Sequence, residues 1–349
     1  MHRPLLIPPR QRGRFARGVL RTAGILALAW LAQATPGSAA GAPDSSSVAV
    51  AAAPDSVLPT LRFRLVLETS FGRFGVGAGE FSGPRGVAID PLGRILVADA
   101  GNHRVERFDS SGVYLDQFGG FGHDEGRFDR PTALWVGGAL AVWVLDEGNA
   151  RIVKYDLAGR LLGVLVSLRS DEIRAALDLI DPTGIATDRG GQIVVADAAG
   201  DRVLRFDPLG SILTVRGGFG SQAGRFDRPG GVAVDDYGRI LMGDAGNRRV
   251  QLLDPFGEAL ATYALDLGMT GRDGLAVAFG PDSTWALADR ATGRVAVRGP
   301  GGAVLARHVP KARTDPRISD LAFDGAGRLV ASDARGHRVV RFRLEAASP

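Results

Sequence analysis

The chain has 349 residues, including 49 glycines, 19 prolines and no cysteine, so disulfides and lipid attachment at a cysteine are excluded. Its formal net charge is +4, but six arginines and no acidic residue fall within residues 1–40. Without that segment, 36 basic residues face 38 acidic ones, a net charge of −2 that argues against a nucleic-acid partner.

Residues 1–40 have the order of a secretory signal peptide. Arginines precede an apolar run at residues 23–31, and Ser38, Ala39 and Ala40 supply small residues for cleavage near Ala40. The run is shorter than the ~20 residues of a spanning helix, so no membrane span is expected after cleavage. Residues 41–60 are rich in Ala, Pro, Ser and Asp and predict a disordered linker. We therefore expect a secreted or periplasmic protein whose folded domain occupies residues 61–349.

An internal repeat dominates the rest of the chain. In six segments an aspartate is followed five positions later by an arginine, and successive aspartates are 47, 51, 47, 45 and 44 residues apart. Such a period is typical of propeller blades. The pairs are Asp99 and Arg104, Asp146 and Arg151, Asp197 and Arg202, Asp244 and Arg249, Asp289 and Arg294, and Asp333 and Arg338.

Each repeat predicts four short strands. In the first repeat these cover residues 86–90, 94–99, 103–109 and 114–119, separated by turn residues. Four antiparallel strands make one propeller blade. Glycine-rich connectors between blades recur at residues 71–84, 118–131 and 216–229, and we expect a phenylalanine of each to plug the space between blades.

These segments resemble the NHL-repeat family, whose repeat combines a "GVAVD" strand with an "ADxGNxRV" segment. The matching stretches are ADAGNHRV from Ala98 and GDAGNRRV from Gly243. The resemblance extends over residues 71–342 and implies an all-β, six-bladed propeller of four-stranded antiparallel blades. It specifies the fold far better than the activity.

The ends of the repeat array and one insertion complete the predicted fold. The sixth repeat lacks an outer strand, whereas an unassigned strand at residues 62–69 precedes the first, so the N-terminal strand should close the ring. Residues 170–180 predict a short amphipathic helix capped by Ser170, with Ile173, Ala176, Leu177 and Ile180 on one face. It would pack on blades two and three, or alternatively act as a lid or docking element. Blade five is the least typical repeat.

The Asp–Arg pairs are better explained as a structural device than as a catalytic ring, because they recur in every blade. His103, His123 and His337 fall on the face that carries the connectors and the loops between second and third strands. A zinc site built from them is an alternative that we do not prefer, because their loops leave the blades away from the channel. Trp135, Trp143 and Trp285 are interpreted as packing between blades.

Ligand contacts are expected instead at the rim of the central channel, at the position just before each inner strand. This position is occupied by different residues in the six repeats, as a grafted binding site requires, although solvent exposure alone could produce the variation. The residues are Arg85, Thr132, Thr183, Gly230, Asp273 and Ser319.

No nucleophile elbow, HExxH or phosphate-binding segment occurs in the sequence. We therefore predict a monomeric, non-enzymatic binding or scaffold module for a protein, peptide or glycan of the cell envelope, with no cofactor and no resident metal. The alternative is a metal-dependent hydrolase or lyase with a site in the channel. The resemblance allows it, because the amidating lyase of peptide hormones has a similar repeat, but that enzyme's site cannot be matched to residues here.

Overall fold

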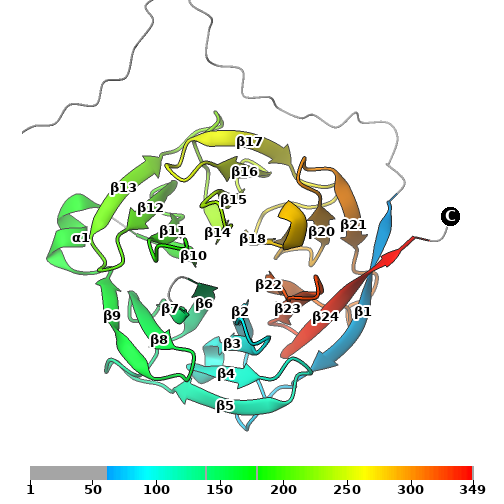
Figure 1. Ribbon diagram of the computed structural model, residues 1–349, viewed down its shortest axis with the longest axis horizontal. Coiled ribbons are helices and arrows are strands. Elements are labelled where there is room, and N and C mark those ends of the chain that lie inside the picture. The colour runs from blue at the N-terminus through cyan, green and yellow to red at the C-terminus, as the bar shows by residue number, and fades with distance from the viewer. Residues whose placement is uncertain (1–60, 138–139, 178–179, 348–349) are drawn as a thin grey trace, which may run out of the picture. The chain divides into compact units, whose positions relative to one another are not determined.

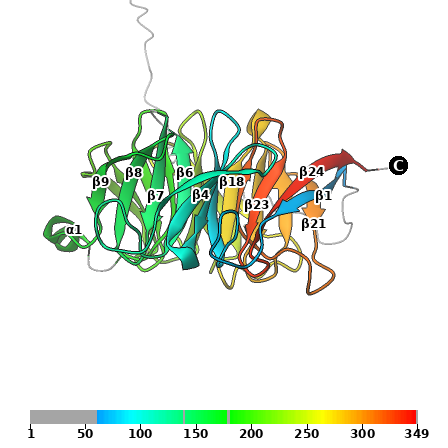
Figure 2. The same ribbon diagram turned by 90° about the horizontal axis from the view of Figure 1, so that it is seen from below.

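Six four-stranded antiparallel sheets stand around a central axis in the computed structural model, which describes residues 61–137, 140–177 and 180–347. The first strand of each blade lies nearest the axis and the fourth at the periphery (Figure 1). From the side the propeller is a disc (Figure 2). The predicted six-bladed propeller is confirmed, whereas the proposed signal peptide and linker lie outside the described residues.

The strands follow the predicted repeat closely. Blades one to three contain β2 (Pro84–Ile89), β3 (Ile95–Asp99), β4 (Arg104–Phe108), β5 (Tyr114–Gly119), β6 (Pro131–Gly137), β7 (Ala141–Asp146), β8 (Arg151–Asp156), β9 (Leu161–Ser167), β10 (Pro182–Thr187), β11 (Ile193–Asp197), β12 (Arg202–Phe206) and β13 (Ile212–Gly217). Blades four to six contain β14 (Pro229–Val234), β15 (Ile240–Asp244), β16 (Arg249–Leu253), β17 (Ala259–Ala264), β18 (Leu275–Phe279), β19 (Trp285–Asp289), β20 (Val295–Arg298), β21 (Val304–His308), β22 (Ile318–Phe323), β23 (Leu329–Asp333) and β24 (Arg338–Ala346). Two 3-10 turns, η1 (Ala100–Asn102) and η2 (Pro281–Ser283), complete the elements of blades one and five.

The N-terminal strand closes the ring, as expected. β1 (Phe63–Phe71) pairs antiparallel with β24, so the outer strand of blade six comes from the beginning of the domain. The pairing begins at Phe63 opposite Ala346 and ends at Phe71 opposite Val339. Closure leaves β24 with a partner on both sides, which removes an exposed sheet edge.

The hairpin turns are built by aspartates. In the turn between β2 and β3, one carboxylate oxygen of Asp90 accepts the N–H groups of Leu92 (2.9 Å) and Arg94 (2.8 Å). Gly93 takes a φ of 78°, a left-handed conformation that glycine adopts without strain. Asp90 is buried, so this local bonding also satisfies a carboxylate that water cannot reach.

The hydrophobic core consists of layers between neighbouring blades. Between blades six and one, for example, Val330 and Val339 pack with Val87 and Val97. The last phenylalanine of each long connector fills such a layer, and Phe81, Phe128 and Phe226 are no more than 1% exposed. The predicted plugging role of these connectors is therefore seen at three blade junctions.

The inserted helix is shorter than predicted. α1 (Asp171–Ala176) begins after Ser170, whose hydroxyl accepts the N–H of Ile173 at 3.3 Å. Ile173 and Leu177 are buried in the layer between blades two and three, as expected. Ala176 is exposed, contrary to the prediction, because the chain leaves the helix at Leu177 and becomes extended.

Candidate functional site

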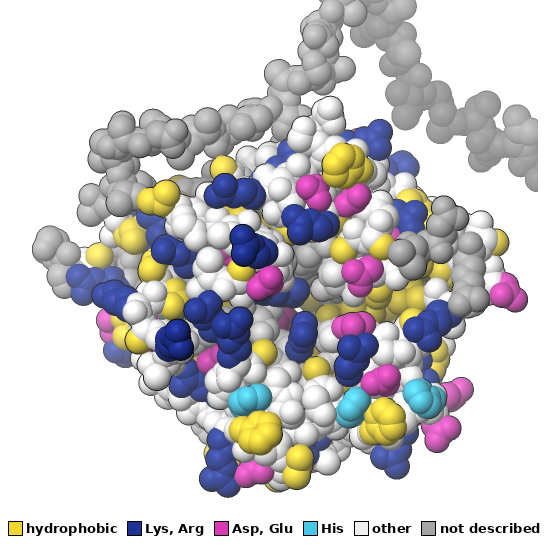
Figure 3. Space-filling view, turned by 180° about the vertical axis from the view of Figure 1, so that it is seen from behind, with side chains coloured by type: hydrophobic (Ala, Val, Ile, Leu, Met, Phe, Trp, Pro, Cys, Tyr) yellow, Lys and Arg dark blue, Asp and Glu magenta, His cyan; other side chains and the backbone are white. Residues whose placement is uncertain are grey.

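The connector face is the face of the disc that carries the inter-blade connectors and the loops between second and third strands. Lys and Arg side chains gather on it around a central hollow (Figure 3). Because the described part of the chain carries few lysines, this is chiefly arginine. The net charge of the chain does not reveal this concentration of positive charge on one face.

Five of the six repeated Asp–Arg pairs form ion pairs just beneath this face. The N–O distances are 3.1 Å for Arg104–Asp99, 2.8 Å for Arg151–Asp146, 2.7 Å for Arg202–Asp197, 2.6 Å for Arg249–Asp244 and 2.9 Å for Arg338–Asp333. In blade five, Asp289 instead accepts hydrogen bonds from the turn at Thr270, and Arg294 donates to the Leu267 carbonyl at 3.3 Å. The ion pair predicted in blade five, between Asp289 and Arg294, is therefore not formed among the described residues.

The paired arginines also hold the connectors. Arg249 donates to the carbonyl oxygens of Ser221 (2.5 Å), Gln222 (2.8 Å) and Arg225 (2.8 Å), all in the connector that precedes its blade. Asp244, which is fully buried, accepts the N–H of Asp227 at 2.9 Å with its other oxygen. Charge-assisted bonds of this kind fix the path of the connector relative to its blade.

The three histidines of the connector face are each used locally. The Nδ1 atoms of His103 and His337 accept the N–H groups of Arg130 and Gly83, both at 3.0 Å. His123 Nδ1 lies 2.6 Å from Asn149 Oδ1. The described residues contain no group of three His, Cys, Asp or Glu side chains arranged to hold a metal ion.

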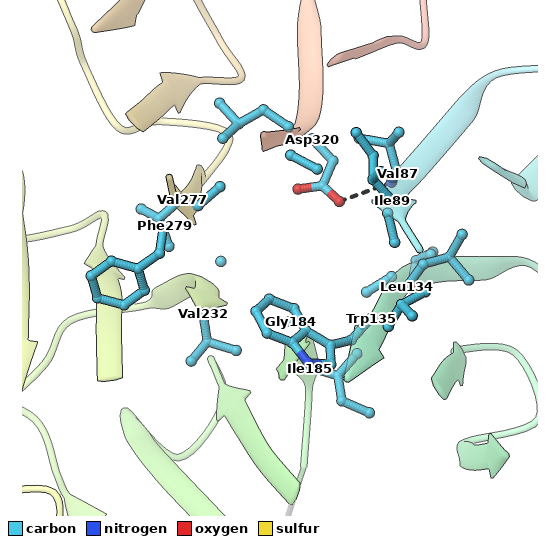
Figure 4. Close-up of a pocket in the computed structure, with 18 of the residues that line it drawn as sticks. Val87, Ile89, Leu134, Trp135, Gly184, Ile185, Val232, Val277, Phe279 and Asp320 are labelled. Carbon is cyan, nitrogen blue, oxygen red and sulfur yellow. Dashed lines mark hydrogen bonds between the residues drawn. The ribbon is translucent and has the colours of Figure 1, made fainter. Parts of the chain in front are cut away.

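A cavity of about 150 Å³ occupies the central channel. Most of the residues that line it are apolar by type and come from the inner strands, including Val87, Ile185, Val232 and Phe279, although polar atoms make up the larger part of the exposed wall (Figure 4). Asp320 projects into the cavity from one side, and the Trp135 indole extends into it from the other. The cavity therefore combines apolar side chains and polar atoms with one carboxylate.

Asp320 and Trp135 are departures from the repeat, and the strand register shows why. The positions equivalent to Asp320 are Gly86, Ala133, Gly184, Gly231 and Ala276. The positions equivalent to Trp135 are Ala88, Ala186, Ala233, Ala278 and Ala322. These two positions carry glycine or alanine in the other blades because the inner strands approach closely. A Cβ on Gly86, for example, would come within 2.8 Å of the Leu134 nitrogen. Two side chains too large for their rows thus extend into the same cavity.

The Asp320 carboxylate is only half satisfied. Its Oδ2 accepts the Val87 N–H at 3.0 Å, and the backbone N–H of Leu321 also favours the charged carboxylate, whereas no side chain of the described residues bonds to Oδ1. Burial raises the pKa of Asp320 to about 6, against the opposing effect of the nearby Arg290 guanidinium. The side chain is therefore ionised at neutral pH, but at an energetic cost that a positively charged ligand group would offset.

Arg290 lies at the mouth of the cavity beside Asp320. It follows β19 at a position where four of the other repeats carry alanine, and its Nε donates to the Ser319 carbonyl at 2.7 Å. Burial lowers the pKa of Arg290, whereas the Asp320 carboxylate raises it, and a guanidinium remains charged. No ion pair joins the two side chains in the described part of the chain, and the terminal nitrogens of Arg290 make no hydrogen bond there. Two opposite charges thus stand close together without neutralising each other by direct contact.

A second hollow of about 400 Å³ opens on the connector face and shares Thr183 and Arg290 with the channel cavity. Its lining also includes Gly230, Arg272 and Asp273. No hydrogen bond or ion pair of the described residues engages the Arg272 side chain. A ligand at the channel mouth can therefore continue over the face into this hollow.

The predicted rim residues fall at different places in this geometry. Thr132 and Thr183 line the channel cavity, and the Thr183 hydroxyl lies 2.9 Å from the Pro229 carbonyl oxygen to which it can donate. Arg85 is exposed and Ser319 is half-buried. Asp273 does not lie directly before its inner strand, because β18 begins at Leu275, which pairs with Asp289 as Pro84 pairs with Asp99, and Asp273 lines the second hollow instead. Whether these residues bind a ligand stays a prediction.

Asp320 and Arg290 were missed as site residues at the level of sequence, and Trp135 was interpreted only as packing. A signal was present, since each of the three is a large residue in a row that holds mostly glycine or alanine. Comparison of the six repeats at the rim position alone does not find them, because they occupy other positions. Trp143 and Trp285 do pack between blades and are no more than 2% exposed.

The NHL repeat family model matches residues 81–108. A stretch of 51 residues is 45% identical to B-box type zinc finger protein ncl-1 of Caenorhabditis elegans and covers 15% of this chain and 6% of that protein. A stretch of 51 residues is 43% identical to Protein brain tumor of Drosophila melanogaster, with 15% and 5% covered. The matched stretches span no more than 6% of the length of these relatives.

Among solved structures, the chain is similar to streptogramin B lyase, with a TM-score of 0.56, 13% identity, and 80% of this chain and 98% of that one covered. A protein of Bacteroides thetaiotaomicron gives a TM-score of 0.59 and 15% identity, with 81% and 76% covered. At these identities the likeness shows the fold alone. None of the helices in the described residues is long and apolar enough to cross a membrane. The chain therefore contains an NHL repeat at residues 81–108 and folds as a six-bladed β-propeller, a fold suited to a binding or scaffold module.

Proposed function

We propose that this propeller is an exported, monomeric binding module of the cell envelope that takes a peptide, glycan or protein ligand on its connector face. The observation that carries the proposal is the channel mouth, where Asp320 and Arg290 stand near each other without a direct ion pair, at the entrance of a cavity lined by many apolar residues. Small-ligand sites combine apolar walls with a few placed polar groups in this way. Export is inferred from the sequence of residues 1–40.

A peptide or the exposed segment of a protein fits these features best among the three ligand classes. Peptides supply apolar side chains for the cavity, together with charged groups of both signs for the mouth. The second hollow extends the contact area beyond the channel, as an extended chain requires. The arginines of the connector face favour a ligand with negative charge beyond its first residues.

The alternative is a metal-dependent hydrolase or lyase in the channel. A catalytic zinc site normally needs three protein ligands. Among the described residues that line the cavity, Asp320 is the only carboxylate and no histidine is present. The geometry therefore supports binding better than metal-assisted catalysis.

A panning experiment tests the proposal. Immobilised wild-type propeller is exposed in parallel to a displayed peptide library and to a glycan array, beside an Arg85→Gln/Arg290→Gln double variant. The matched control is Arg189→Gln, which removes an exposed arginine from the turn between β10 and β11, at the opposite end of the channel. Wild type and control should select the same peptide sequences, and the double variant should lose them. Selection of identical ligands by all three proteins would refute a site on the connector face.

A further inference from the structure

We propose that the channel mouth recognises the free N-terminal residue of a peptide, with its ammonium on Asp320, its apolar side chain in the cavity and the following residues over the second hollow. This inference rests on the proposed function and names the ligand of that site. Asp320 and Arg290 each have polar atoms that can still bind a ligand, and the cavity and the second hollow define the space around them.

The Asp320 carboxylate can accept a hydrogen bond from a ligand in the cavity. Oδ2 is taken by the Val87 N–H, and the carboxylate projects into the cavity, where its only other contact is with the backbone N–H of Leu321 among the described residues. Carboxylate oxygens only accept, so the matching ligand group is a donor, and a positive donor also compensates the buried charge. A peptide ammonium provides both, whereas an acetylated terminus provides no charge.

The second step concerns the cavity beyond Asp320. Its volume of about 150 Å³ equals that of an apolar protein cavity known to accept benzene. Trp135, Phe279 and Ile185 supply the walls. A leucine, methionine or phenylalanine side chain therefore fits where a long charged side chain would be left without a partner.

The third step concerns the direction in which the peptide leaves. Arg290 is fixed next to Asp320, because its Nε donates to the carbonyl of Ser319, the residue just before Asp320. Its free terminal nitrogens can donate to the first peptide carbonyl. The second hollow continues from Arg290 to Arg272, whose unused guanidinium matches an acidic side chain one or more residues farther on. The recognised segment is thus a free apolar residue followed by acidic ones.

The probe is a peptide beginning Leu-Ser-Glu-Asp with a fluorophore at its C-terminus, measured by fluorescence anisotropy with the full propeller domain. Its N-acetylated twin tests the ammonium. A hydrogen bond to a charged group implies a loss of about 10- to 100-fold in affinity on acetylation. Equal affinity of the two peptides, or binding of neither, would overturn the inference. The proposed function would fall only if the panning experiment also found no ligand on the connector face.

Variants separate the charge from the fold. Asp320→Asn keeps the shape and should weaken the free peptide by at least about tenfold while leaving the acetylated peptide unchanged. Asp324→Asn changes a carboxylate at the opposite end of β22 and should change neither. Thermal melts of both variants confirm folding. If Asp320→Asn binds the free peptide as wild type does, Asp320 is not the ammonium acceptor.

The pH profile gives an independent check. The charged group beside Asp320 is the guanidinium of Arg290 after β19, which in turn lies near Arg85 on β2, and the Arg290 guanidinium stays charged. Affinity should fall below about pH 6, where Asp320 gains a proton, and again above about pH 8, where the peptide ammonium loses one. A flat profile between about pH 5 and about pH 9 would contradict the pairing.

Free leucine distinguishes a peptide site from an amino-acid site. It satisfies Asp320 and the cavity but reaches neither the second hollow nor Arg272. It should therefore compete with the labelled peptide only at concentrations about 10-fold or more above those of the unlabelled peptide. Equal potency of free leucine would replace the peptide with a free amino acid as the ligand.

Discussion

Glu106 on β4 is a buried carboxylate that the fold tolerates at a cost. It is 0% exposed, its Oε1 accepts the Gly79 N–H at 3.1 Å and lies 3.1 Å from Arg104, and its Oε2 has no hydrogen-bond partner. Burial raises the pKa of Glu106 to about 7, and the positive charge of Arg104 opposes this only in part. Blade four carries Gln251 at the equivalent position, so a neutral amide already occupies this place in another blade.

We predict that Glu106→Gln stabilises the propeller at alkaline pH. The folded-state pKa lies above the ordinary value of about 4.5, so the folded state holds the proton more tightly and the free energy of unfolding falls as pH rises from about 4.5 to about 7. A difference of about 2.5 pH units corresponds to about 3 kcal/mol once Glu106 is ionised. The neutral amide of the Glu106→Gln variant would remove this cost, giving a gain of about 3 kcal/mol at pH 8 and less than about 1 kcal/mol at pH 5.

Urea unfolding followed by tryptophan fluorescence at both pH values measures the difference. The reciprocal control is Gln251→Glu. Gln251 Oε1 accepts the Gly224 N–H at 2.9 Å, and its amide donates to the Arg225 carbonyl at 2.7 Å. This control should destabilise the propeller at pH 8 by a similar amount. If Glu106→Gln changed the free energy of unfolding equally at pH 5 and pH 8, the charge of Glu106 would not be the source of the cost.

Three further predictions concern the scaffold and export. Arg249→Ala removes the positive charge beside buried Asp244, which keeps only its other hydrogen bonds, and the donor of three connector carbonyls, and it should cost about 3–5 kcal/mol. Arg294→Ala, in the blade without an ion pair, should cost less than about 1 kcal/mol in the same urea assay, and equal losses would contradict the structural role of the pairs. Deletion of residues 61–71 removes β1 and exposes the edge of β24. Size-exclusion chromatography should therefore show aggregates, and a monomer of unchanged melting temperature would argue against closure by this strand. In a Gram-negative host, mass spectrometry of the periplasmic protein should find an N-terminus near residue 41, and a cytoplasmic protein that retains residues 1–40 would refute export.

The fold was predictable because every repeat carries the same local signals. Apolar strands such as residues 95–99 alternate with turns that need Asp and Gly, and the spacing of the aspartates fixes the number of blades. Blade five was the exception. Its connector lacks the proline that starts β2 or β14, so Asp273 was taken for the residue directly before the inner strand, although β18 begins only at Leu275.

The site was less predictable, since it depends on which rows of the repeat face the channel. That Asp320 and Trp135 extend into one cavity follows from the register of six inner strands and from the closure of the ring. The histidines are conspicuous in the sequence but serve the backbone. His103 and His337 each accept a backbone N–H, as Asp201 does from Arg228 at 2.7 Å. The gathering of arginines on one face was equally hidden, because the predicted mature charge is slightly negative and net charge says nothing of position.

A crystal structure of the propeller with a peptide that begins with a free leucine tests most directly whether ligands enter the channel from the connector face. The ammonium should lie about 3 Å from Oδ1 of Asp320, with the leucine side chain toward Trp135 and the rest of the peptide over the hollow that contains Arg272. A peptide bound along the outer strands or on the opposite face, with the channel free of it, would contradict the proposed site.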